Sequence, residues 1–234
     1  MTDIGAAFAA ALSLIVGFDH DLAEIVGLSL QISLAAVAIA TVIGAPVGAA
    51  VALFRFPGRK AVMILLDALM GLPPVVVGLI VYLLLSRAGP FGVFGLLFTP
   101  AAMIIAQVML VVPIVAALTR QVVADLWLEY EEQLRSLGAG AWRTLMTLLW
   151  DARFTLVTAV LAGFGRAVAE VGAVMIVGGN IDHVTRVMTT AIALEVSKGD
   201  LALALGLGII LIVLSMTVSA SVFILRDIVQ RSHA

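Results

Sequence analysis

The chain has 234 residues, of which 63% are hydrophobic and only 12% are charged, and its formal net charge is −2. Soluble domains carry roughly 25% charged residues, so this composition excludes an ordinary soluble protein and indicates an integral membrane protein. The absence of cysteine excludes disulfides and thiolate metal sites. We predict a single domain, residues 1–234, because no repeat or low-complexity linker divides the chain.

The N-terminal stretch, residues 4–18, carries no charge but is shorter than the 20 or so residues that a span needs. We predict that residues 1–18 contain a short helix at the membrane interface or packed on the bundle, with a sixth span as the alternative. A group of acidic residues and one histidine follows, which we expect to be a solvated helix start, although it could also bind a cation: Asp19, His20, Asp21 and Glu24.

Apolar segments long enough to cross a membrane predict five transmembrane helices, at about residues 25–54, 61–86, 99–118, 154–177 and 201–225. Pro73 and Pro74 interrupt the second one, because neither proline can donate a backbone hydrogen bond. In lipid, such a break is tolerated only where it is buried in protein or lines a wet cavity. Pro73 and Pro74 are therefore candidates for a pathway or gate, with a purely structural kink as the alternative.

Positive charge is distributed unevenly among the predicted loops. The loops after the first and third spans and the C-terminal tail hold nine basic residues: Arg55, Arg59, Lys60, Arg120, Arg135, Arg143, Arg153, Arg226 and Arg231. The loops after the second and fourth spans hold three: Arg87, Arg186 and Lys198. The positive-inside rule then places the C-terminus in the cytoplasm and the N-terminus outside.

The longest polar stretch, residues 129–153, lies between the third and fourth predicted spans and is therefore predicted to be cytoplasmic. Its charged residues are Glu129, Glu131, Glu132, Arg135, Arg143, Asp151 and Arg153. We predict a short surface helix that ends at Gly138, a glycine turn, and a second helix from about Ala141. Such a segment could bind a soluble partner, although an ordinary charged loop is the alternative.

Arg166 and Glu170 are four residues apart in the fourth predicted span, so we expect them on one helical face. Charges inside a membrane are costly and usually pair, so the two residues are candidates for a pathway or gate, or for a neutral pair that fixes helix packing. Glu170 as a proton relay would instead indicate an ion-coupled transporter.

Catalytic patterns are not found in the sequence. Neither lysine, Lys60 or Lys198, belongs to a Gly-x-x-x-x-Gly-Lys-Ser/Thr phosphate loop, and no nucleophile–base pair or metal-ligand spacing stands out. We therefore predict that the chain is not an enzyme and binds no metal or cofactor of its own.

Two segments resemble known permeases. Residues 132–138, Glu-Gln-Leu-Arg-Ser-Leu-Gly, resemble the EAA-type motif of bacterial ABC importer permeases, although Gln133 and Leu134 replace the usual Ala-Ala. The Leu-Pro that often follows is also replaced, by residues 150–153. Residues 165–181 and 185–195 look like the permease subunit of tungstate-type importers, and molybdate permeases carry a related pattern.

This resemblance implies an all-α type I importer fold in the inner membrane of a prokaryote. It also implies a homodimer, a cytoplasmic ATPase dimer that binds ATP and magnesium, and an extracytoplasmic substrate-binding protein. A dimer is also favoured because five spans are few for enclosing an aqueous path. No nucleic-acid partner is expected.

The resemblance assigns roles to particular residues. A coupling helix at residues 129–138 would contact the ATPase through Glu129, Glu131, Glu132, Arg135, Leu137 and Gly138. The binding protein would contact Asn180, Asp182, Arg186, Glu195 and Lys198. The implied substrate is an oxyanion, with tungstate first and molybdate or sulfate as alternatives. A stand-alone transporter that uses Glu170 or Asp67, or a membrane scaffold without transport activity, remains a different class of function.

Overall fold

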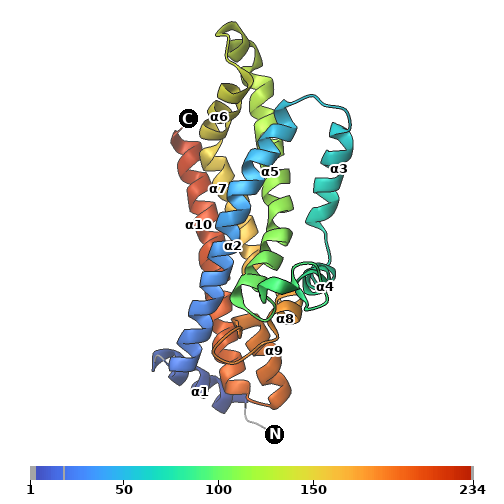
Figure 1. Ribbon diagram of the computed structural model, residues 1–234. Helices are drawn as coiled ribbons and strands as arrows, with labels where there is room; N and C mark the ends of the chain where they lie inside the picture. The colour runs from blue at the N-terminus through green and yellow to red at the C-terminus, as the bar shows by residue number, and fades with distance from the viewer. Residues whose placement is uncertain (1–3, 18, 233–234) are drawn as a thin grey trace. The chain divides into compact units, whose positions relative to one another are not determined.

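A computed structural model describes residues 4–17 and 19–232. Every regular element in these residues is helical (Figure 1). The elements are α1 (Ile4–Val16), α2 (His20–Leu53), α3 (Arg59–Met70), α4 (Pro74–Leu85), the 3-10 turn η1 (Gly92–Phe94), α5 (Pro100–Ser136), α6 (Ala141–Asp151), α7 (Arg153–Val168), α8 (Gly172–Gly178), α9 (Met188–Lys198) and α10 (Leu201–Ser232).

Among the described residues, α2, α5 and α10 are each long and apolar enough to cross a membrane alone. The number rises to five if α3 with α4 and α6 with α7 each count as one broken span. The predicted number of about five spans agrees with this upper value. The first helix has 13 residues, which by length is short for a span.

The chain packs as two compact units that are interleaved in sequence. The first contains the chain up to Ala36 together with Pro73–Gln107 and Ala167–Val218. The second contains Val37–Leu72, Val108–Arg166 and the chain from Ser219 on. Because α2, α5, α7 and α10 each continue from one unit into the other, neither unit is a contiguous stretch of sequence.

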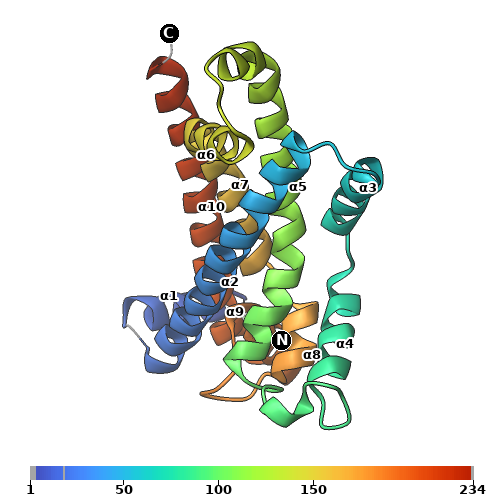
Figure 2. The same cartoon turned by 45° about the horizontal axis from the view of Figure 1, so that its top comes forward.

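In the first unit, α4 and α8 lie side by side (Figures 1 and 2). Their backbones approach closely at Gly78, where an added Cβ would lie 2.8 Å from the Cα of Ala173. Small residues allow this approach between helices in a membrane, where dispersion contacts supply much of the packing energy. The neighbouring valines Val77 and Val174 are almost fully buried.

In the second unit, α2 and α5 make a similar close contact. A Cβ at Gly48 would overlap the carbonyl oxygen of Ala116. The end of α2 is completed by Arg59, which donates from Nε to the carbonyl of Val51 and from Nη2 to that of Ala52, both at 2.7 Å. The last carbonyls of α2 would otherwise lack intrahelical partners, so Arg59 acts as a C-terminal cap.

The charged segment at residues 129–138 is not a separate helix, contrary to prediction. It is the last part of α5, which runs without interruption to Ser136. Because no glycine or proline occurs between Pro113 and Gly138, nothing in the sequence ends the helix where its polarity changes. The second predicted helix does begin at Ala141, as α6.

The predicted fourth and fifth spans also differ from the structure. The fourth, expected at residues 154–177, is interrupted between Val168 and Gly172 and so forms α7 and α8. The short tail expected after the fifth span instead continues α10 as a helix to Ser232, and residues 233–234 lie outside the described chain.

Candidate functional site

The predicted coupling residues lie at the charged end of α5. Glu129 and Glu132 are exposed, and the Glu131 carboxylate lies 2.6 Å from the Arg135 guanidinium, one helical turn away. The guanidinium also lies 5.9 Å from the centre of the Trp127 ring. Ion pairs of this spacing contribute only about 0.3–0.5 kcal/mol, so these charges are not needed to hold the fold and are available to a partner.

A glycine turn ends α5. Gly138 has a φ of +66°, in the left-handed region that favours glycine. Its amide donates to the carbonyl of Arg135 and the amide of Ala139 donates to that of Leu134, both at 3.0 Å. Leu137 is exposed beside this turn. The turn fixes the direction in which the chain enters α6.

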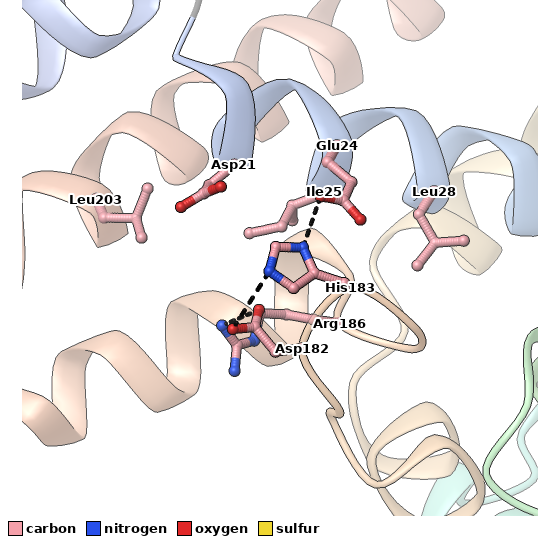
Figure 3. A pocket seen from close by; sticks show the side chains of 8 residues that line it. All are labelled: Asp21, Glu24, Ile25, Leu28, Asp182, His183, Arg186 and Leu203. Carbon is pink, nitrogen blue, oxygen red and sulfur yellow. Dashed lines mark hydrogen bonds and ion pairs between the residues drawn. The ribbon is translucent and has the colours of Figure 1, made fainter.

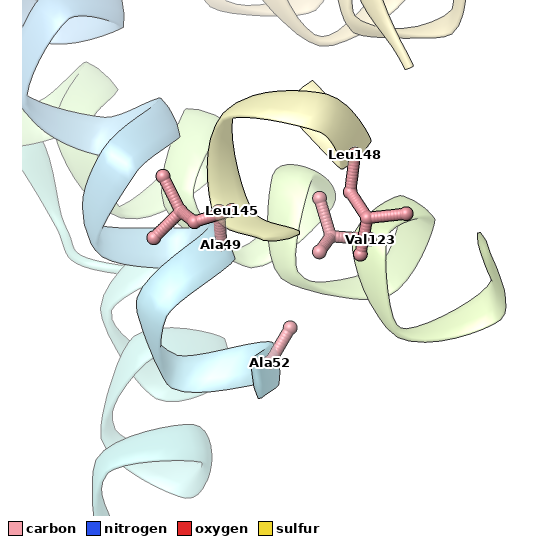
Figure 4. Packing of buried hydrophobic residues seen from close by; sticks show 5 residues of the cluster. All are labelled: Ala49, Ala52, Val123, Leu145 and Leu148. Atoms are coloured by element: carbon pink, nitrogen blue, oxygen red, sulfur yellow. The ribbon is translucent and has the colours of Figure 1, made fainter. Parts of the chain in front are cut away.

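One face of α6 anchors the charged segment to the second unit. Leu145 and Leu148 are buried against Ala49 and Ala52 of α2 and Val123 of α5 (Figure 4). Because this cluster joins α6 to the body of the unit, α6 and the end of α5 form one packed element. The chain then bends by 72° between α6 and α7.

The opposite face of α6 is apolar and exposed. Trp142 and Trp150 have exposed fractions of 68% and 70%, and Met146 between them is also exposed. These residues are four positions apart, so they form one stripe along the helix. Trp142, Met146 and Trp150 were not among the predicted contacts. The signal was available as two tryptophans at helical spacing on the face opposite to Leu145 and Leu148.

The predicted break at Pro73 and Pro74 is confirmed. The helix stops at Met70, and α4 starts at Pro74 with proline at its first position, where the missing amide hydrogen costs nothing. The carbonyl of Pro73 accepts from the amides of Val76 and Val77. The role of the break as a pathway or gate stays a prediction.

Glu170 lies in the break between α7 and α8, with an exposed fraction of 3%. Its Oε1 accepts from the amide of Ala173 at 3.0 Å, and its backbone carbonyl accepts from the Thr189 hydroxyl at 2.7 Å. The residue therefore holds the start of α8 and fastens it to α9. Because α7 ends at Val168, Glu170 lies outside the helix that contains Arg166, so the prediction of one continuous helix through both residues is wrong, whereas their pairing stays a prediction.

The predicted contacts for a binding protein lie in the segment after α8. Asn180 exchanges hydrogen bonds with Thr190, and Asp182 pairs with Arg186 at 2.6 Å. Of these predicted contacts, Asp182 is exposed, whereas Asn180 and Arg186 are partly buried.

Two further predicted contacts lie at the end of α9. Glu195 and Lys198 form an ion pair at 2.8 Å. Glu195 has an exposed fraction of 4%, whereas Lys198 is exposed. The segment after α8 thus presents the charges of Asp182 and Lys198 outward, while Glu195 is buried.

His183 fastens this segment to the beginning of α2. Its Nδ1 lies 2.8 Å from Oε2 of Glu24, in a shallow pocket that Asp21, Asp182 and Arg186 also line (Figure 3). The hydrogen bond to Glu24, then the negative charges of Glu24 and Asp182, raise the pKa of His183. The contact between Glu24 and His183 was not predicted, because nothing local to His183 indicates a partner 159 residues away.

The acidic group at the start of α2 has donor atoms close to one another. One ligand atom each from His20, Asp21 and Glu24 lie within 4.8 Å. His20 and Asp21 are exposed, and Glu24 already holds His183. Glu24 is therefore shared between this group and the segment after α8.

The described chain thus combines interrupted candidate spans with a charged segment that continues one span. Comparison with known proteins identifies its family. The model of the family described as binding-protein-dependent transport system inner membrane component matches residues 40–233, so the chain belongs to this family.

Several named relatives are similar along much of the chain. The tungstate uptake system permease protein TupB of Peptoclostridium acidaminophilum is 40% identical over 97% of this chain and 100% of the relative. The protein of the same name from Campylobacter jejuni is 41% identical over 64% of this chain and 62% of the relative. The sulfate transport system permease protein CysW of Synechocystis is 32% identical over 70% of this chain and 62% of the relative.

The family match and the helical architecture agree with the class of protein predicted from the sequence. The chain is an all-α, multi-pass protein of the prokaryotic cell membrane with the type I ABC importer permease fold.

Proposed function

We propose that this chain is the permease subunit of an ABC importer that carries tungstate into the cell. The observation that carries this proposal is the 40% identity to a protein named as a tungstate uptake permease over 97% of the chain. A second relative with the same name matches at 41%. Sulfate is the alternative substrate, since a sulfate permease is 32% identical, and molybdate is a further oxyanion to test.

The assembly that we propose is a homodimer with two cytoplasmic ATPase subunits and an extracytoplasmic binding protein. The family description, a membrane component that depends on a binding protein, supports the last of these. The excess of Lys and Arg in one set of loops supports a cytoplasmic C-terminus and an outer N-terminus. ATP and magnesium would bind to the ATPase, so that this chain itself performs no catalysis.

We further propose that residues 129–138 are the coupling segment. Because this segment is the end of α5, a movement of the docked ATPase would pass into α5 without an intervening loop. The buried cluster around Leu148 would pass the same movement to α2. ATP can drive alternating access in this way only if the ATPase contacts the two permease states with different free energies.

On the outer side, we propose that Asp182 and Lys198 contact the loaded binding protein. The other predicted contacts would hold these two side chains and their segment in place. Arg186 forms an ion pair with Asp182, and Glu195 forms one with Lys198. Asn180 accepts a hydrogen bond from the Thr190 hydroxyl. Pro73, Pro74, Arg166 and Glu170 remain our candidates for the pathway or gate. Their positions at or beside interruptions of the spans support this role.

The direct test is reconstitution of the permease with its ATPase and binding protein, followed by measurement of ATP hydrolysis with tungstate, molybdate or sulfate. We expect stimulation by tungstate alone. Stimulation by sulfate or molybdate alone would keep the class of transporter and replace the substrate. A complex that no oxyanion stimulates would reject the oxyanion proposal.

An ion-coupled transporter makes a different prediction at Asp67. This carboxylate lies 3.0 Å from the Arg120 guanidinium, an arrangement that supports a structural ion pair. We therefore expect Asp67→Asn to keep substrate-stimulated ATP hydrolysis. Uptake that continues without ATPase subunits and stops in Asp67→Asn would favour the ion-coupled class.

A further inference from the structure

Polar side chains gather around a small cavity within the first unit. The cavity is lined by Ser29 and Ser33 of α2, Gln107 of α5, Glu170 in the α7–α8 break and Thr189 of α9, together with apolar neighbours. All five polar residues are buried. A buried polar group in the middle of apolar helices is costly unless it is hydrogen-bonded, so the partners of each group matter.

Most of these groups have partners within the protein. The Ser29 hydroxyl donates to the carbonyl of Ile25 and accepts from the amide of Met188, both at 2.7 Å. The Thr189 hydroxyl donates to the carbonyl of Glu170 at 2.7 Å. The hydrogens of these two hydroxyls are thus engaged, while each oxygen keeps a lone pair that can accept a further bond.

Gln107 is the exception. Its Nε2 donates to the carbonyl of Ala167 at 3.2 Å. This hydrogen bond fixes the orientation of the amide group and leaves Oε1 on the side away from Ala167. Among the described residues, Oε1 has no hydrogen-bond partner, and the side chain has an exposed fraction of 4%. Exchanging the positions of Oε1 and Nε2 by rotating the amide would not remove the unsatisfied acceptor, because the Ala167 carbonyl would then face the acceptor Oε1. Oε1 of Gln107 therefore lacks a donor in the part of the chain that the structure describes.

The cavity is partly open, and its narrow part limits what that donor can be. The space open to the centre of a water molecule is about 10 Å³. This is close to the roughly 10–15 Å³ that one water molecule needs. A tetrahedral oxyanion is far larger, and as an acceptor it would not satisfy Oε1. The cavity therefore matches water in both volume and hydrogen-bonding character.

We propose that this cavity binds one ordered water molecule, which donates a hydrogen bond to Oε1 of Gln107. Ser33 and Thr189 also line the cavity, and their hydroxyl oxygens can accept the second hydrogen of the water. The water completes a hydrogen-bonded connection between α2, α5 and α9. This site is independent of the substrate that the permease carries.

A cavity-filling substitution distinguishes a bound water from an empty void. Ser33→Thr keeps the hydroxyl and adds one methyl group to the cavity wall. If the methyl displaces a water that satisfies Gln107, we expect the melting temperature in detergent to fall by about 2–4 °C. If the cavity is an empty void, filling it should raise the melting temperature, which would overturn the proposal.

The matched background is Gln107→Met, which keeps the side chain length and removes the oxygen acceptor. In that background Ser33→Thr should no longer lower the melting temperature, because no acceptor is left without its donor. An equal fall in both backgrounds would indicate a steric clash alone and would also overturn the proposal.

Direct observation does not depend on any variant. In a high-resolution map of the unmodified complex, we expect a density peak about 2.7–2.8 Å from Oε1 of Gln107. A map that resolves other buried waters and has no peak there would overturn the proposal. Preparing the same complex in rubidium chloride provides the second control, since a stronger peak would identify a monovalent cation in place of water.

Discussion

At the scale of single residues, the contact between His183 and Glu24 links pH to local structure. A histidine whose pKa is raised on folding binds its proton more tightly in the folded state. Its contribution to stability is therefore fully present below the unfolded pKa of about 6.5 and is lost as pH rises through the folded pKa. Asp182 and Asp21 add to the effect, since both raise the pKa of the same ring.

We expect the segment around His183 to open more readily at about pH 8 than at about pH 6, as the imidazole loses its proton. Hydrogen exchange of residues 179–187 measures this directly. Glu24→Gln should remove most of the difference between the two pH values, whereas the nearby exposed His20→Gln should leave it. A pH dependence that is equal in the unmodified protein and in Glu24→Gln would contradict this assignment.

The interruption of the helix at Glu170 is a feature that the sequence did not predict. Ala169, Glu170 and Val171 contain no helix breaker, so the sequence predicts one continuous span. At this break the carbonyl of Ala167 accepts from the Gln107 amide and the carbonyl of Glu170 accepts from the Thr189 hydroxyl, and both donors come from other parts of the chain. Contacts of this range leave no local signal.

At the scale of elements, the helix ends that were predicted correctly are those with a local cause. Prolines at 73 and 74 and the glycine at 138 determine where helices stop, whatever surrounds them. The separate coupling helix was predicted wrongly because a change from apolar to charged residues was taken as a boundary. A helix continues through such a change as long as its residues favour helix formation.

The contact between α2 and α5 gives a prediction with a control in the same helix. Gly48→Ala places a methyl group against the backbone of Ala116, which cannot rotate away, so we expect a loss of about 1–3 kcal/mol of stability. Gly27→Ala should instead be neutral or stabilising by up to about 1 kcal/mol, because nothing lies within 4 Å of its added Cβ.

Thermal unfolding of both glycine variants in the same detergent measures the difference. Similar melting temperatures for Gly48→Ala and Gly27→Ala would mean that the two helices do not approach as closely as described.

The two faces of α6 should respond differently to truncation. Leu148 is fully buried, so Leu148→Ala should cost about 2–5 kcal/mol of stability. Trp150→Ala removes a larger but mostly exposed side chain and should change the melting temperature little. If the apolar stripe of α6 contributes to the ATPase contact, Trp150→Ala should still weaken association with the ATPase. Loss of stability in Trp150→Ala and not in Leu148→Ala would reverse the assignment of the faces.

At the scale of the whole molecule, the coupling proposal concerns how contact with the permease controls ATP hydrolysis by the ATPase. We expect the charge reversal Glu132→Arg to lower substrate-stimulated ATP hydrolysis at least tenfold, which corresponds to about 1.4 kcal/mol of lost interaction. Asp125→Arg is the matched control, because it is an exposed acidic residue two turns earlier on α5 and outside the coupling segment.

Both variants should keep the melting temperature of the unmodified permease, which separates coupling from folding. Equal loss of stimulated hydrolysis in the two variants would indicate a general effect of positive charge on α5 and would reject residue 132 as a specific contact.

The length of α5 has a mechanical consequence. Its 37 residues extend for about 55 Å, at about 1.5 Å per residue, whereas the hydrocarbon core of a membrane is about 30 Å thick. Roughly 25 Å of helix must therefore stand in water or among lipid headgroups. A span of this length is a lever arm: tilting it by about 10° would displace a point 25 Å from the pivot by about 4 Å. One part of α5 is thus surrounded by lipid, and another part of the same helix extends into the water, where a soluble protein can bind it.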